Sequence, residues 1–162
     1  MNRVHHHQAL IHISADLVGG EPLVRAIIQQ MNSIVELMAV SSIYKRYLSL
    51  SRADLNALIV TVIRVSTDSA VDEMLWHFKQ YTKDTKAKVQ LLTYDDLVVL
   101  SPQLTLPHPS LHTDHLIIRC GSEAWPHYEH PIMQKTLSEI AASASPATDA
   151  EFYMQGKTLV DF

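Results

Sequence analysis

The sequence predicts an α+β domain with a ferredoxin-like β-α-β-β-α-β core, in which two helices pack on one face of an antiparallel sheet. Three observations support this prediction: short apolar runs of strand length, two amphipathic segments with helical spacing, and the order in which the two kinds alternate. The chain has 162 residues, of which 47% are hydrophobic and 19% charged, as in one ordinary folded domain. We therefore expect a single folded domain.

The first half of the core is expected between residues 9 and 44. Residues 9–13 are apolar apart from His12, which is typical of a buried strand, and Gly19-Gly20 marks the turn that follows. Pro22 is tolerated in the first turn of a helix. The helix predicted after it presents one apolar stripe: Val24, Ile27, Ile28, Met31 and Val35. Residues 38–44 then have the composition of a second strand.

The second half of the core repeats this pattern. Residues 58–63 are too β-branched to favour a helix, and residues 67–69 supply candidate caps for the helix after them. That helix has its own apolar stripe: Val71, Met74, Leu75 and Phe78. Residues 89–100 are predicted to be a strand that contains two aspartates. We expect the domain to span residues 1–142, with a terminal helix at 131–142, followed by a linker and C-terminal tail at 143–162.

Composition excludes several classes of partner. The formal net charge is −4, and the 13 Lys and Arg residues are scattered, so no basic stripe for nucleic acid is expected. No apolar run approaches the roughly 18 residues that cross a bilayer, and the polar start lacks a secretory signal. The single Cys120 excludes an internal disulfide. We expect a cytoplasmic protein without nucleic-acid or membrane partners.

Four short stretches resemble a known family. Residues 104–109, Leu-Thr-Leu-Pro-His-Pro, resemble the Leu-x-Leu-Pro-His-Pro signature of the 6-hydroxymethyl-7,8-dihydropterin pyrophosphokinases. In the same order as in that family, residues 41–44 resemble its Ser-Ser-x-Tyr, residues 54–57 its Phe-Leu-Asn-Ala, and residues 93–97 its Thr-x-Asp-x-Asp. The resemblance spans residues 9–131.

The resemblance implies a folate-pathway enzyme that transfers diphosphate from ATP to a dihydropterin, with two Mg²⁺ ions held by Asp-x-Asp. Such transfers depend on in-line positioning and on cations placed at the charged oxygens. Carried over to this chain, the resemblance implies metal-binding and catalytic roles for Asp95 and Asp96, and a catalytic phosphate contact for His108. The remaining implied contacts are with ATP, from Lys83, Lys86 and Lys88, and with the pterin, from Asn56 and Tyr44.

Several residues depart from the family pattern. Aligned on Thr93, the second carboxylate position falls at Leu97, and the adjacent Asp95 and Asp96 point to opposite faces of a strand unless a bulge turns both inward. The family's Arg-Trp-Gly-Pro-Arg run is replaced by residues 88–92, and an expected Arg falls near Asp114, which would repel triphosphate. Activity is therefore expected to be impaired or repurposed.

Two other hypotheses follow from the residues. In the first, the chain is a non-catalytic ligand-binding or protein-interaction homologue that uses residues 152–154 and 159–160 on a partner or on its own core. In the second, His108, His112 and His115, or the tract at residues 5–7, bind Zn or Ni. The spacing of these histidines gives the metal hypothesis little support, because His108 precedes Pro109 and a regular helix there is disfavoured. Each candidate also has an alternative, purely structural role: a hydrogen-bonded Asp95 beside a solvated Asp96, a turn histidine at His108 and a core tyrosine at Tyr44.

Overall fold

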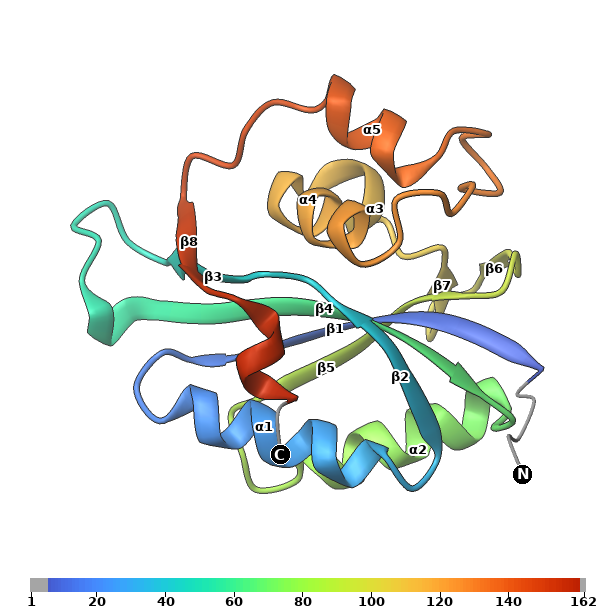
Figure 1. Ribbon diagram of the computed structural model, residues 1–162, viewed down its shortest axis with the longest axis horizontal. Helices are drawn as coiled ribbons and strands as arrows, with labels where there is room; N and C mark the ends of the chain where they lie inside the picture. The colour runs from blue at the N-terminus through green and yellow to red at the C-terminus, as the bar shows by residue number, and fades with distance from the viewer. Residues whose placement is uncertain (1–5, 161–162) are drawn as a thin grey trace.

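A computed structural model describes residues 6–160 and has three layers, with an antiparallel sheet between two groups of helices (Figure 1). The strands of the sheet follow the order β5-β1-β4-β3-β8, and β2 also pairs with β4. Their bounds are β1 His7–Asp16, β2 Val35–Val40, β3 Ile43–Tyr47, β4 Ala57–Thr67, β5 Lys88–Tyr94 and β8 Ala150–Met154. A separate small hairpin is formed by β6 Val99–Leu100 and β7 Thr105–Leu106.

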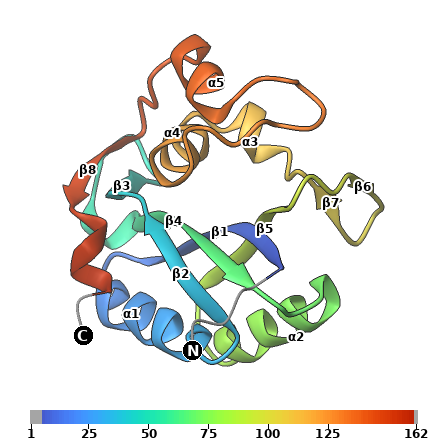
Figure 2. The same cartoon turned by 45° about the vertical axis from the view of Figure 1, so that its right-hand side comes forward.

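The helices cover both faces of the sheet. Helices α1 (Gly20–Met31) and α2 (Val71–Thr82) lie on one face, so the predicted α+β class is confirmed (Figure 2). Three strands rather than two separate these helices, because the strand predicted at 38–44 is interrupted at Ser41-Ser42 and contributes to both β2 and β3. On the other face lie α3 (Ser110–Thr113), α4 (His115–Ala124) and α5 (Leu137–Ser143). Of this second layer only one helix was expected, at residues 131–142; α5 begins later, at Leu137, because Thr136 forms its N-cap in a capping box with Glu139. Two single turns, η1 (Asp54–Asn56) and η2 (Gly156–Leu159), complete the fold.

The alternation of side chains along β1 divides the interior into two cores. Ala9, Ile11 and Ile13 belong to the core beneath α1 and α2. Leu10, on the opposite face, belongs to the core beneath α4 and α5. Successive side chains of a strand point to opposite faces, so His12 lies on the α4 side of the sheet.

The predicted strand at residues 89–100 was wrong in extent. Strand β5 ends at Tyr94, because Asp95 adopts a left-handed backbone conformation with φ 49° that an extended strand does not continue through. The two aspartates therefore lie in the turn after the strand. The sheet does contain an irregularity here, but it lies between Leu10 and Ile11 of β1, where Leu92 is the extra residue of β5.

The segment predicted to be a linker and tail adds to both the sheet and the core. Strand β8 pairs with β3, and Leu159 of η2 is completely buried against the α1 side of the sheet. Arg25 of α1 donates a hydrogen bond to the carbonyl of Thr158. Over residues 6–160, no helix is long and apolar enough to cross a membrane.

Candidate ligand-binding site

A cavity of about 560 Å³ lies at the outer edge of β5, between α2 and residues 102–109. Leu75, Phe78 and Leu104 are among its apolar walls. Its polar lining includes two lysines, two glutamines and one histidine: Lys79, Lys88, Gln90, Gln103 and His108. Among the described residues that line it there is no Asp or Glu. The cavity is thus positively charged, although the chain as a whole has a net charge of −4.

His108 is fixed at this cavity by contacts on both ring nitrogens. Its Nδ1 accepts a hydrogen bond from the backbone N–H of Ser110 at 3.1 Å, so the neutral ring carries its proton on Nε2. That Nε2 lies 2.8 Å from the amide group of Gln90. The contact is satisfied when the amide oxygen of Gln90 faces His108, which turns the amide NH₂ group toward β1.

The amide group of Gln90 also contacts His12 of β1. The two side chains meet 3.4 Å apart at the Nδ1 of His12, and the ring is only 6% exposed. Within the described part of the chain, its Nε2 has no hydrogen-bond partner. Burial lowers the pKa of His12 to about 4. His12 is therefore neutral at pH 7.

Charge at the cavity comes from its lysines at neutral pH. Burial, and secondly the positive charge of Lys88, lower the pKa of His108 below its ordinary value. His108 is then a neutral donor and acceptor at pH 7, and Lys79 and Lys88 are the cations.

Asp114 does not present a free negative charge. Its carboxylate makes two contacts with the guanidinium of Arg46, at 3.0 and 2.5 Å, and caps α4 by accepting from the backbone N–H groups of Leu116 and Ile117. Burial alone would raise the pKa of Asp114, but the Arg46 hydrogen bonds outweigh it and hold the pKa below its usual range. The repulsion expected from the sequence is thus largely neutralised within the protein.

We expect Asp114→Ala to destabilise the protein by about 2 kcal/mol, because it removes a helix cap and leaves a half-buried guanidinium without its two-pronged partner. Chemical denaturation at pH 7 measures this. Asp149→Ala, which removes only a more exposed contact to Arg46 at 3.5 Å, is the control and should cost less than about 1 kcal/mol. Equal losses in the two variants would contradict the assigned role.

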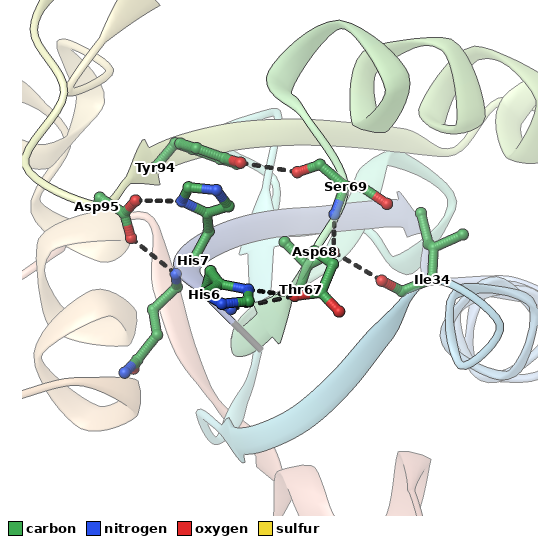
Figure 3. Close-up of polar contacts among 9 residues, drawn as sticks. His6, His7, Ile34, Thr67, Asp68, Ser69, Tyr94 and Asp95 are labelled. Carbon is green, nitrogen blue, oxygen red and sulfur yellow. Dashed lines mark hydrogen bonds and ion pairs between the residues drawn. The ribbon is translucent and has the colours of Figure 1, made fainter. Parts of the chain in front are cut away.

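The structure places Asp95 beside the beginning of β1, away from the cavity (Figure 3). Its carboxylate lies 2.6 Å from Nδ1 of His7 and accepts from the backbone N–H of Gln8 at 2.8 Å. The ring of His7 stacks on Tyr94, whose hydroxyl donates to the carbonyl of Ser69. Asp96 is exposed.

The position of His108 shows which residues of β5 face the cavity. Gln90 contacts His108, and Lys88 is two residues before it, so these two share one face of the strand; Val89 and Leu91, on the other face, also line the cavity at this sheet edge. Asp95 lies five residues beyond Gln90, about 16 Å along an extended strand. Magnesium binding by Asp95 and Asp96 stays a prediction, now for a location at the other end of β5.

The other predicted residues are spread over the molecule. Lys83 and Lys86 are exposed in the connection between α2 and β5, which leads to Lys88 at the cavity. Asn56 is exposed in η1, just before β4. Because the β1–β4 ladder pairs Asp16 with Leu58 and His7 with Thr67, Asn56 and Asp95 flank opposite ends of this ladder.

Tyr44 is buried on the α4 side of the sheet. Its hydroxyl donates to Glu123 and accepts from Nε of Arg119 at 2.8 Å. It lines a second cavity of about 580 Å³ between β3, α4 and α5. A pterin contact by Tyr44 or Asn56 stays a prediction. Neither residue lines the first cavity, at the edge of β5, which we call the Lys88 cavity.

The histidines of the metal hypothesis are separated. His108 is bound to Gln90 and Ser110, whereas the ring of His112 lies edge-on to that of His130, with centroids 6.1 Å apart. Over residues 6–160, no group of three His, Cys, Asp or Glu side chains has the geometry of a metal site. His5 of the tract lies outside the described residues.

Sequence reasoning missed three residues of this region: His12, Gln90 and Arg46. His12 had a usable signal, since it is the one polar residue within the apolar run at residues 9–13. Gln90 and Arg46 had none, because their roles arise from contacts with segments distant in sequence.

The fold and the cavity define an α+β domain with a cationic cavity at one sheet edge. No protein-family model and no curated protein matches the sequence. Solved structures do match: wild-type HPPK-DHPS of Plasmodium falciparum with pterin and p-hydroxybenzoate has a TM-score of 0.74 at 9% identity, covering 93% of this chain and 47% of that one. Wild-type HPPK-DHPS without a named ligand gives 0.72 at 8% identity, covering 93% and 49%.

A third structure, wild-type HPPK-DHPS with STZ-DHP, gives a TM-score of 0.68 at 9% identity and covers 86% of this chain and 42% of that one. The chain thus spans about half the length of the proteins that it matches. At these identities the likeness shows the fold, which is that of the HPPK domain.

Proposed function

We propose that this chain is a divergent member of the pterin pyrophosphokinase family that binds a small anionic ligand in the Lys88 cavity without transferring diphosphate. The observation that supports this most is the pair of residues on β5 beside His108, which is Lys88 and Gln90 rather than two carboxylates. An ammonium and an amide there favour an anion directly, without a bridging metal ion.

The chemistry of the lining suggests the ligand class. Lys79 and Lys88 supply point charges for phosphate or carboxylate oxygens, and the amides of Gln90 and Gln103 supply hydrogen bonds. Leu75 and Phe78 provide an apolar wall for a flat ring system. The cavity volume of about 560 Å³ is within the usual range for small-ligand sites. ATP and a dihydropterin, both implied by the family resemblance, are the first ligands to test.

Magnesium does not fit this donor set. The ion prefers carboxylate oxygens in a nearly octahedral arrangement, and Lys88 offers a cation at the position where a carboxylate would be needed. We therefore assign no metal-dependent catalytic step to this cavity.

Calorimetric titration with ATP in EDTA tests the proposal. We expect binding without Mg²⁺, and Lys88→Gln should weaken it about tenfold by removing one charge-assisted contact. Lys86→Gln, an exposed lysine outside the cavity lining, is the matched control and should leave the affinity unchanged. Binding that strictly requires Mg²⁺, or equal loss in the two variants, would contradict the proposed site.

The second candidate is an active diphosphotransferase that uses Asp95 and Asp96. It is favoured by the fixed position of the Asp95 carboxylate, which accepts hydrogen bonds from Nδ1 of His7 at 2.6 Å and from the backbone N–H of Gln8 at 2.8 Å, next to the exposed Asp96. Release of AMP from Mg-ATP with 6-hydroxymethyl-7,8-dihydropterin tests it, with Asp95→Ala expected to abolish any activity. No AMP at high protein concentration leaves the binding function, for which we propose a cytoplasmic location.

A further inference from the structure

Strand β8 forms one end of the sheet, and its outer edge is open. Among residues 6–160 the strand pairs with β3 alone, and no other strand lies at its outer edge (Figures 1 and 2). The opposite end of the sheet is different, because the carbonyl of Leu92 in β5 accepts a hydrogen bond from the backbone N–H of His108. An uncovered edge strand is a template for pairing with another strand.

The backbone groups that β8 directs outward can be identified. The carbonyl of Asp149 accepts from the N–H of Tyr47 at 2.8 Å, so position 149 faces β3. Both backbone groups of a residue in an antiparallel strand point to the same side, and the side alternates along the chain. Glu151 therefore faces β3, whereas Ala150 and Phe152 direct their N–H and C=O groups outward.

Apolar side chains gather at the same end of the molecule. Phe152 is 57% exposed and Tyr153 is 38% exposed. The connection between β3 and β4 projects beside β8 in Figure 1, and Arg52 fixes it there by donating to the carbonyl of Thr148. That connection carries three exposed leucines: Leu48, Leu50 and Leu55. Such a concentration is typical of an interaction surface.

We propose that β8 pairs antiparallel with β8 of a second copy of this chain, about a two-fold axis at Phe152. The outward N–H and C=O of Phe152 then bond to the same groups of the second copy, and the two phenyl rings come together. A two-fold axis requires a self-complementary surface. The sequence around Phe152 meets this requirement because the axis places Glu151 opposite Tyr153 rather than opposite another Glu151.

Charge complementarity favours β8 of a second copy over a strand of an unrelated protein. Lys45 of β3 holds its Nζ over the ring of Tyr153 at 5.6 Å. Glu151 lies on the same face of the sheet, where it accepts from the hydroxyl of Tyr47. Lys45 is also ion-paired with Asp54 at 3.2 Å and lies opposite Glu151 of its own chain. In the dimer, each Glu151 in addition faces Tyr153 and Lys45 of the second copy, so the opposite charges found within each chain also approach each other across the axis.

Sedimentation equilibrium of the full chain at concentrations up to about 1 mM tests the proposal, because an interface of two short strands is small and its dimer is weak. We expect the average mass to rise toward twice the monomer mass. Phe152→Lys should keep the protein monomeric throughout. Trp76→Lys is the matched control, since Trp76 is 58% exposed on α2, and it should dimerise like the wild type.

Two further variants separate pairing from folding. Phe152→Pro removes an outward N–H that β3 does not use, so it should block dimerisation while the circular dichroism spectrum is retained. Glu151→Lys should weaken dimerisation at least tenfold. A wild-type chain that stays monomeric up to about 1 mM, or a dimer that survives both Phe152 variants, overturns the proposal.

Discussion

Acidification from pH 7 to pH 4 is expected to lower the free energy of unfolding by about 3 kcal/mol through His12 alone. Burial lowers the pKa of His12 from 6.5 to about 4 in the folded protein. The folded state therefore binds fewer protons than the unfolded state between these two values. The stability is fully present above pH 6.5, falls as the pH drops toward 4, and changes no further below that.

Urea denaturation at half-unit pH steps measures this effect. His12→Leu is the comparison variant, because it keeps an apolar side chain of similar size and removes the titrating ring. His108 and His130 also have a lowered pKa, mainly through burial, so the wild type and variant both lose stability with acid, and the difference between the two curves isolates His12. Parallel curves between pH 6.5 and pH 4 would show that His12 is not buried in a neutral form.

The loss of stability caused by protonation of Asp114 occurs in a different pH range. Because its pKa is lowered, its contribution is present above pH 3.8 and is lost only as the pH falls further. The two groups can therefore be distinguished in one pH series.

The second large effect is expected from Gly156→Ala, which should destabilise the protein by about 3 kcal/mol. A Cβ atom at Gly156 would lie 1.9 Å from the backbone oxygen of Ser41 and 2.9 Å from a methyl group of Val40. The oxygen cannot rotate away as a side chain does, so η2 must move. That movement would withdraw Leu159, which is completely buried, from the core.

Gly121→Ala is the control for this prediction. The added methyl group would meet the side-chain ends of Leu111 at 3.2 Å and Leu137 at 3.5 Å, which can adjust. Alanine also favours the helical conformation of α4. We expect a change below about 1 kcal/mol, measured by thermal and urea unfolding. A Gly156 variant as stable as the Gly121 variant would show that η2 is not closely packed on Ser41.

The fold was largely predictable from local patterns. The stripes of α1 and α2 and the β-branched run of β4 each indicate their elements without tertiary information. Helix α4 was missed although it has a clear apolar face and Asp114 as a side-chain cap. Comparison of Asp114 with the arginine of the family pattern does not reveal its capping role, which depends on the backbone N–H groups of Leu116 and Ile117. Strand β8 is short and largely exposed, so its pairing depends on β3 rather than on its own composition.

The candidate site was only partly predictable. His108 and Lys88 were identified from the His-Pro signature and from charge, and both line the cavity at the edge of β5. Asp95 was chosen because aspartates are the expected metal ligands, but its location is decided by where β5 ends. Gln90 could not be recognised, since only the approach of His108 shows that it faces the cavity.

The pairing of β3 with β8 joins parts of the chain that are made at very different times. Tyr47 and Glu151 are 104 positions apart, and η2 completes the packing on Ser41 later still. During synthesis, β3 therefore remains an open, aromatic sheet edge after β1, β2 and β4 have emerged from the ribosome. We expect this interval to be the period in which the nascent chain is most prone to aggregate and most dependent on chaperones.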